Sequence, residues 1–273
     1  MDDETQTGTD TQSYVFDARW QQERERLGHL ESAWDGLTLR RLDELGVAPG
    51  WRCLEVGAGG GSVAAWLCDR VGPAVSVVAT DIDTRFLDVL KLPNLEVRRH
   101  DITSETAGEA DFDLVHARLL LEHLPAYREA LRHMVAALKP GGVLLIEDFD
   151  HTTFQPDPGA GEEALRLWRS FSAAFEALAA GRGLDLGFGR RLHGLLAETG
   201  LEDVVAEGRS VIHRGGEPVT SMLRLSLLSL RDGLVSAGAM PSQDVDALVT
   251  LLQEPSFRLM SQLMVGASGR RAA

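Results

Sequence analysis

Short apolar runs alternate with helical patterns through the middle of the chain. The runs have the length and β-branched content of buried strands, and the segments between them repeat apolar residues at the spacing of one helical face. After a first apolar strand that ends near Glu55, the predicted strands are 74–80, 95–99, 111–116 and 143–146, and the predicted helices are 84–91 and 126–138. A chain in which strands and helices alternate forms a parallel sheet with helices on both faces.

The two ends of the chain follow different patterns. Residues 1–13 are rich in Thr, Asp and Gln, which predicts a disordered tail, and 14–48 are predicted to form helices. Beyond residue 150 the predicted helices are 161–180, 190–199, 217–236 and 242–253, and the predicted strands are 203–207 and 257–267. We therefore expect one α/β domain over 14–273. Its parts are a core at 49–150, a lid and helix at 151–200, and a helical insertion at 208–256 before the last strand.

The composition is that of a globular chain, with 44% apolar and 25% charged residues among 273. The net charge of −14 repels phosphate backbones, which argues against a nucleic-acid substrate. No apolar run approaches the roughly 20 residues that span a bilayer, and the acidic start is unlike a signal or transit peptide. These features predict a cytoplasmic enzyme that acts on a small molecule without membrane insertion, and they leave a homodimer open.

A glycine-rich turn, Glu55-Val56-Gly57-Ala58-Gly59-Gly60-Gly61-Ser62, follows the first strand and precedes a helical segment. Glycines at this spacing let the backbone turn tightly and approach a ligand closely. A carboxylate at Glu55 attracts the ammonium of a methionyl group and repels a pyrophosphate. Ser62 also stands where the dinucleotide fingerprint has Gly or Ala. The turn therefore favours S-adenosylmethionine over NAD.

Two further acidic residues end the next two predicted strands. Asp81 can accept hydrogen bonds from both ribose hydroxyls, and Asp101, followed by Ile102, can accept one from an adenine amine. In open α/β sheets, ligands bind beyond the carboxyl ends of the strands, where these residues lie. Each Asp alone could instead cap a helix, so the prediction depends on the three acids occurring together.

With these motifs the chain resembles the class I S-adenosylmethionine-dependent methyltransferases, especially the bacterial small-molecule branch similar to ubiquinone and menaquinone methyltransferases. The matching segments are 55–61, 79–83, 100–102, 112–118 and 138–144. The resemblance implies a Rossmann-like, seven-stranded, mostly parallel sheet whose last strand is antiparallel, with N-terminal helices and a helical lid. It implies cofactor contacts by Tyr14, Glu55, Val56, Gly57, Ala58, Gly59, Gly61, Ser62, Asp81, Ile82, Asp101, Ile102, His116, Ala117 and Arg118.

The residues after the fourth strand narrow the class of methyl acceptor. They contain neither the Asn/Asp-Pro-Pro sequence of amino-methylating enzymes nor a Pro-Cys nucleophile, which argues against adenine, glutamine and pyrimidine acceptors. A base assists methyl transfer to a hydroxyl, and the candidates near the strand ends are His116, His123 and His151. Asp148 and Asp150 alternate along a strand and face opposite sides, so they do not predict a metal site.

The helices after residue 150 are predicted to cover the carboxyl ends of the strands and to form the acceptor pocket. The predicted pocket residues are Phe149, Trp168, Phe171, Phe175, His213 and Met222. Such an apolar lining suits an aromatic or polyketide-like secondary metabolite. The predicted reaction is methyl transfer from S-adenosylmethionine to a hydroxyl, carboxyl, amine or carbon. The alternatives are a non-methylating S-adenosylmethionine-binding protein such as a cyclase, and an NAD-dependent oxidoreductase.

Overall fold

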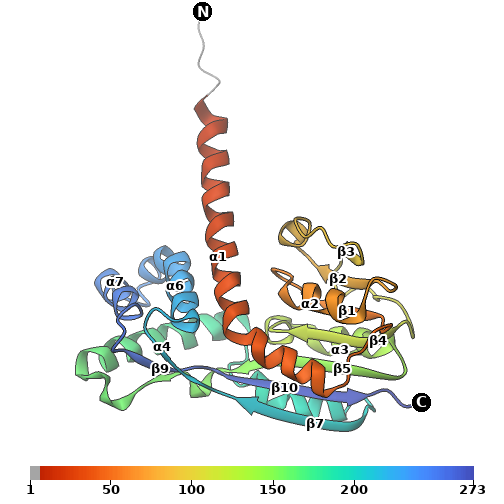
Figure 1. The fold of residues 1–273 in the computed structure, drawn as a ribbon. Coiled ribbons are helices and arrows are strands. Elements are labelled where there is room, and N and C mark those ends of the chain that lie inside the picture. Colours follow the sequence, from red (N-terminus) through yellow and green to blue (C-terminus); the bar gives the residue numbers. More distant parts are fainter. Residues whose placement is uncertain (1–6) are drawn as a thin grey trace, which may run out of the picture.

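A seven-stranded sheet forms the centre of the molecule, with the strand order β3-β2-β1-β4-β5-β10-β7 (Figure 1). Its strands are β1 (Cys53–Val56), β2 (Val77–Asp81), β3 (Leu95–Arg99), β4 (Phe112–Arg118), β5 (Leu138–Asp150), β7 (Glu202–Arg209) and β10 (Leu263–Arg270). The pairs among β1 to β5 are parallel, whereas β10 is antiparallel to both β5 and β7. This confirms the predicted Rossmann-like sheet with an antiparallel last strand.

The structure is a computed structural model that describes the backbone of residues 7–273 and the side chains of residues 20–273. The first helix, α1 (Thr7–Glu44), is one continuous helix that begins inside the segment predicted to be disordered. Residues 1–6 of that segment and the side chain of Tyr14, a predicted cofactor contact, lie outside the described residues. The second half of α1 packs onto the body through buried Trp34 and Leu42.

Helices cover both faces of the sheet because the strands carry apolar side chains on both sides. Val115 of β4 faces the core formed with α3 (Tyr127–Ala137) and α5 (Leu192–Ala197). Its neighbour Leu114 faces the opposite core, formed with α1 and α2 (Ser62–Val71). Among the described residues, no helix combines the length and the apolar character needed to cross a membrane.

Three helices and a small second sheet lie beside the main sheet, and we call them together the lid (Figure 1). They combine parts of the segments predicted as a lid and as a helical insertion. The helices are α4 (Glu162–Arg182), α6 (Pro218–Ser236) and α7 (Ser242–Leu251). The sheet has the order β6-β9-β8 and consists of β6 (Gln155–Pro156), β8 (Ile212–Arg214) and β9 (Arg258–Met260). The sequence did not predict this sheet, because strands of two or three residues are too short to show an alternating pattern.

Two predicted helices are shorter than expected. The segment predicted as 84–91 contains only the 3₁₀ turn η1 (Thr84–Phe86), and the one predicted as 190–199 divides into η5 (Phe188–Arg191) and α5. In the first segment Leu87 packs against the glycine-turn side of the sheet, beside Ala64 and Ala79. This tertiary contact buries the apolar residues of the short connection without a full helix.

Candidate functional site

The glycine turn lies directly beyond β1 and folds the backbone back toward β2. Gly57, Gly59 and Gly61 have φ values of 68°, 54° and 87°, a left-handed conformation that residues with a side chain rarely adopt. The backbone amides of Gly57 and Ala58 both donate to the carbonyl of Thr80, at 2.8 and 3.0 Å. The turn is thus a rigid loop whose shape depends on glycine.

Asp81 braces this turn from the end of β2. Its Oδ2 accepts a hydrogen bond from the amide of Gly59 at 3.0 Å, and its Oδ1 accepts one from the amide of Asp83 at 3.0 Å. The following residue, Ile82, is 68% exposed, which leaves a large apolar side chain open to a planar ligand. The carboxyl end of β2 therefore combines a hydrogen-bond acceptor, the Asp81 carboxylate, with the exposed apolar side chain of Ile82.

At the end of β3, Asp101 has a local partner. It accepts hydrogen bonds from the hydroxyl and the amide of Thr103, at 2.6 and 2.9 Å, and these bonds lower its pKa. Ile102 is buried in the core below. Asp101 therefore caps a local turn, which was the alternative to a contact with adenine. Its side chain is nevertheless exposed, so the carboxylate is also accessible to a ligand.

A cavity of about 410 Å³ extends from the glycine turn to the lid. At one end the predicted cofactor residues Glu55, Gly57, Ala58, Gly59, Ser62 and Arg118 line it, and at the other end the predicted acceptor residues Phe149, Phe171, Phe175 and Met222. His123 and His151 also line the cavity, whereas His116 does not. The structure thus joins both predicted parts of the site in one space of a size that suits a small molecule.

Several predicted site residues lie outside this cavity. Val56 and Ala117 are buried in the core below the strand ends, and Gly61, Asp81, Ile82, Asp101 and Ile102 are not among its lining residues. Trp168 packs against Phe154 and Phe171, with ring centroids at 5.0 and 5.2 Å, because its position on α4 faces the lid core. His213 lies in β8 of the small sheet, 3.4 Å from Glu217. Trp168 lines an adjoining cavity of about 210 Å³, which shares His151, Phe154, Phe171 and Phe175 with the main cavity. His213 is not among the lining residues of the main cavity.

Helix α1 supplies residues that the sequence did not indicate. Arg26, Leu27, Leu30 and Glu31 line the cavity beside the glycine turn. Glu31 accepts a hydrogen bond from the amide of Ser62 at 3.3 Å, and a side chain on Gly60 would collide with its carboxylate. Burial is the main cause that raises the pKa of Glu31, and the negative charge of the nearby Asp35 is the second. The cofactor end of the cavity is therefore bordered by carboxylates and by the guanidinium groups of Arg26 and Arg118.

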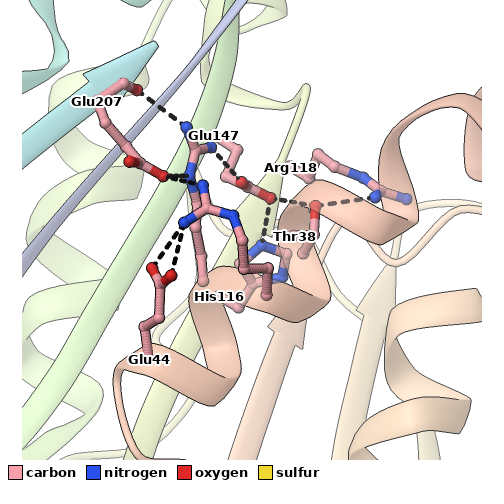
Figure 2. Close-up of polar contacts among 8 residues, drawn as sticks. Thr38, Glu44, His116, Arg118, Glu147 and Glu207 are labelled. Atoms are coloured by element: carbon pink, nitrogen blue, oxygen red, sulfur yellow. Dashed lines mark hydrogen bonds and ion pairs between the residues drawn. The ribbon is translucent and has the colours of Figure 1, made fainter. Parts of the chain in front are cut away.

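His116 lies at the centre of a buried charge network (Figure 2). Its Nδ1 lies 2.6 Å from Glu55 Oε2, and its Nε2 lies 3.3 Å from Glu147 Oε2. Burial alone would lower the pKa of His116, but the two carboxylates outweigh it and raise the pKa to about 9. Both ring nitrogens of His116 thus face carboxylates, which favours the charged imidazole, and the side chain is enclosed away from the cavity.

This arrangement also changes the interpretation of Glu55. The carboxylate was predicted to attract the ammonium of the cofactor, but one of its oxygens contacts His116, its partner in the β1–β4 pairing. The negative charge of Glu55 is thus largely matched within the protein, although its side chain still borders the cavity. Glu31 on α1 supplies a second carboxylate at this end.

Glu147 connects the network to α1. Thr38 Oγ1 lies 2.5 Å from Glu147 Oε2 (Figure 2), and Arg41 Nη1 lies 2.5 Å from Glu147 Oε1. Burial raises the pKa of Glu147, but His116, Arg41 and Thr38 outweigh burial and lower it to about 2. The buried charges of α1 and β5 therefore compensate one another.

Arg41 continues from Glu147 to the edge strand β7. Its Nε and Nη2 donate to the side chain and the carbonyl of Glu207, at 2.8 and 2.9 Å. The guanidinium crosses β10 at Gly266, where any side chain would collide with it. Arg118 makes a second link to α1, because it donates to Thr38 at 3.0 Å and to Asp35 at 2.8 Å. These contacts hold α1 against the sheet, from β4 and β5 to the edge strand β7.

The network predicts how stability depends on pH. The folded-state pKa of His116, about 9, lies above its usual 6.5, so its contribution is complete below pH 6.5 and is lost as the pH rises toward 9. The folded-state pKa of Glu147, about 2, lies below its usual 4.5, so its contribution is complete above pH 4.5 and is lost as the pH falls toward 2. Urea unfolding across pH should show this plateau, and His116→Gln should weaken the alkaline decline. An unchanged decline in that variant would contradict the assignment.

A sharp turn after β4 brings a second polar group to the cavity. Leu119 has a φ of 53°, a strained value for a residue with a side chain, and leads into the 3₁₀ turn η2 (Leu121–His123). Glu122 Oε2 lies 3.2 Å from His151 Nε2, and Oε1 lies 3.4 Å from His123 Nε2. The side chain of His123 is 57% exposed and that of His151 only 11%. The lid end of the cavity thus contains a carboxylate between two histidines.

Comparison with protein families gives a match over most of the chain. The model of a family described as methyltransferase domain matches residues 16–206. A demethylmenaquinone methyltransferase of Renibacterium salmoninarum is 34% identical over 43% of this chain and 50% of its own length. A ubiquinone/menaquinone biosynthesis C-methyltransferase, UbiE, of Pseudomonas putida is 31% identical over 56% of this chain and 59% of its own length. The chain thus spans about half the length of the curated relatives it matches.

Solved structures share the fold at low identity. A phosphoethanolamine N-methyltransferase of Haemonchus contortus, in complex with phosphomonomethylethanolamine and S-adenosylhomocysteine, aligns with a TM-score of 0.54 at 18% identity, over 88% of this chain and 53% of its own. The cyclase SpnF aligns with a TM-score of 0.53 at 17% identity, over 88% of this chain and 81% of its own. At such identities these likenesses bear on the fold alone.

Proposed function

The chain belongs to the family of methyltransferase domains, and from that premise we propose that it transfers the methyl group of S-adenosylmethionine to a hydroxylated aromatic ring of the quinol type. The observation that carries the proposal is the cavity that joins the glycine turn to an aromatic-lined lid. The two curated relatives, whose names refer to quinone methylation, support a ring of this class. The family match also argues against the alternative of an NAD-dependent oxidoreductase.

The residues at the glycine-turn end fit the chemical groups of S-adenosylmethionine. Its methionyl part is a zwitterion, and the cavity wall there offers carboxylates for the ammonium and Arg26 and Arg118 for the carboxylate. Asp81 would accept from the ribose hydroxyls, and Ile82 and Asp101 would contact the adenine. When bound, the cofactor supplies an electrophilic methyl group. The protein's own part is to align the acceptor with it and to exclude water.

His151 is the base that we propose for the acceptor hydroxyl. Its ring lies between the aromatic rings of Phe149 and Phe175, each with a centroid 5.5 Å away, inside the acceptor end of the cavity. His123 lines the same cavity but is mostly exposed, and His116 is enclosed in the charge network. A base must lie within reach of the proton that it accepts, which favours His151.

Two adjoining cavities suggest that the acceptor carries an apolar extension. A cavity of about 270 Å³ shares Glu122, His123, Phe175 and Leu184 with the main cavity. It also shares Leu178, Arg182 and Leu230 with a third cavity of about 500 Å³ between α4 and α6. Together these neighbouring cavities offer more space than a single ring would fill, and the one between α4 and α6 is lined mainly by Ala, Gly and Leu, so we propose a ring with a hydrocarbon tail.

Binding and transfer experiments test the proposed function. Calorimetric titration should give micromolar binding of S-adenosylmethionine and of its demethylated product, and no binding of NAD. Incubation with chemically reduced naphthoquinol and benzoquinol acceptors, with and without a short isoprenoid tail, should add one methyl group detectable by mass spectrometry. The tailed acceptors should have the lower KM. Binding of the cofactor without transfer to any of these rings would overturn the proposed acceptor class, and binding of NAD alone would overturn the cofactor.

A further inference from the structure

Glu122 is a buried carboxylate whose two oxygens contact two different histidines. Its side chain is only 2% exposed, and η2 places it at the lid end of the cavity. The contact to His151 Nε2, at 3.2 Å, is the shorter and the more enclosed of the two. A buried carboxylate beside an imidazole accepts a hydrogen bond from the ring and thereby selects its tautomer.

This contact determines which nitrogen of His151 is free. When Nε2 carries the proton that faces Glu122, the lone pair of the neutral imidazole is on Nδ1. His151 Nδ1 is buried and has no hydrogen-bond partner among residues 20–273. A buried polar atom without a partner is uncommon in folded proteins, and here it belongs to a ring that lines the cavity.

A second buried acid, Asp148, interacts with the charge of Glu122. Asp148 on β5 is fully buried, and burial, followed by the negative charge of Glu122, raises its pKa well above the usual value. Burial and a neighbouring negative charge both favour the protonated form of a carboxyl, so the shift directs the negative charge of the pair toward Glu122.

We propose that Glu122 is a positioning residue, which holds His151 in one orientation and one tautomer so that Nδ1 accepts the proton of the acceptor hydroxyl. The proposal rests on the proposed function. The hydroxyl proton passes to Nδ1, and the electron pair released into the ring forms a new carbon–methyl bond. The ring carbon then loses its own hydrogen as a proton to water, and the oxygen takes a proton back from Nδ1, which restores the aromatic quinol. The electron pair of the sulfur–methyl bond stays on sulfur, which yields S-adenosylhomocysteine. Glu122 acts on the reaction through His151, whose Nε2 lies 3.2 Å from its carboxylate.

Kinetics of single and double variants test whether Glu122 acts through His151. Glu122→Gln should lower kcat about 10- to 100-fold with little change in the KM of either substrate, and His151→Gln should lower it about 100-fold or more. The double variant should be no slower than His151→Gln, because the positioned group is already absent. Glu198→Gln, a surface variant whose native carboxylate pairs with Arg128 at 2.7 Å, is the matched control and should keep full activity.

A measurement without any acceptor separates this inference from the proposed function. Nitrogen NMR of the imidazoles, assigned with His151→Gln, should show the Nε2-protonated form of His151 in the native protein and a mixture in Glu122→Gln. Calorimetry with S-adenosylmethionine reports whether each variant is folded. The inference would be overturned if the kcat losses of the two single variants multiplied in the double variant. It would also be overturned if the tautomer of His151 were unchanged in Glu122→Gln. If Glu122→Gln and Glu122→Asp both fail to fold, Glu122 is a structural residue and the inference is wrong. Absence of transfer by the native protein would instead contradict the proposed function.

Discussion

Replacement of Asp81 by alanine is expected to weaken S-adenosylmethionine binding at least about 30-fold, because it removes the two hydrogen bonds proposed from the ribose hydroxyls, each worth about 1–3 kcal/mol when charge-assisted. The structure adds a second reason for the loss. Asp81 accepts from the amide of Gly59 at 3.0 Å, so its removal also releases the glycine turn. Calorimetric titration of the purified variant with S-adenosylmethionine measures the change directly.

Asp83→Ala is the matched control for this prediction. Asp83 lies two residues further on, and its side chain pairs with Arg85 at the surface, away from the glycine turn. Its loss should change the affinity by less than about threefold, which corresponds to the usual small effect of a surface substitution. Equal affinities of Asp81→Ala and the native protein would refute the placement of the cofactor at the end of β2.

Replacement of Arg41 by methionine is expected to lower the free energy of unfolding by about 3–5 kcal/mol, because it leaves Glu147 without its guanidinium partner. Glu147 has no exposed surface, and Arg41 Nη1 is 2.5 Å from it. Methionine keeps much of the apolar stem of the side chain, so the loss reports mainly on the charge. Urea unfolding at neutral pH provides the measurement.

Two companion variants make the stability prediction specific. Arg40→Met removes the neighbouring arginine, which pairs with Glu44 and Glu207 at the surface, and should cost less than about 1 kcal/mol. Adding Glu147→Gln to Arg41→Met should recover part of the lost stability, because the buried negative charge is then absent. Equal losses in the Arg40 and Arg41 variants would show that the buried pairing is not the source of stability.

The sheet was predictable because each strand carries its own local signal. The run at 95–99 and the helix near 126–138 show periods that do not depend on distant residues, and the structure confirms both as β3 and α3. The segment 84–91 was predicted less well, because its apolar spacing fits a helix while a contact of Leu87 across the sheet permits a short turn. Local pattern and tertiary packing conflict there, and the packing prevails.

The cofactor end of the site was only partly predictable for a related reason. The glycines of the turn lie close together in the sequence, and Asp81 ends the next predicted strand. Both can therefore be recognised as parts of a sequence motif. Glu31 and Arg26 reach the same cavity from α1, whose sequence carries no such motif. Their role depends on where a helix crosses the strand ends, which no local pattern indicates.

By itself the sequence determined the strands of the main sheet in their order, the glycine turn and the acids at the strand ends. These depend on backbone conformation and on residues close together in the chain. Only the tertiary structure decided which charges meet. Arg41 and Glu147 are 106 residues apart, and Glu122 and His151 are 29 apart, yet each pair lies within hydrogen-bonding distance. Coulomb interactions and burial act through space, so the roles of Glu55, His116 and Glu122 were determined only when the chain was folded.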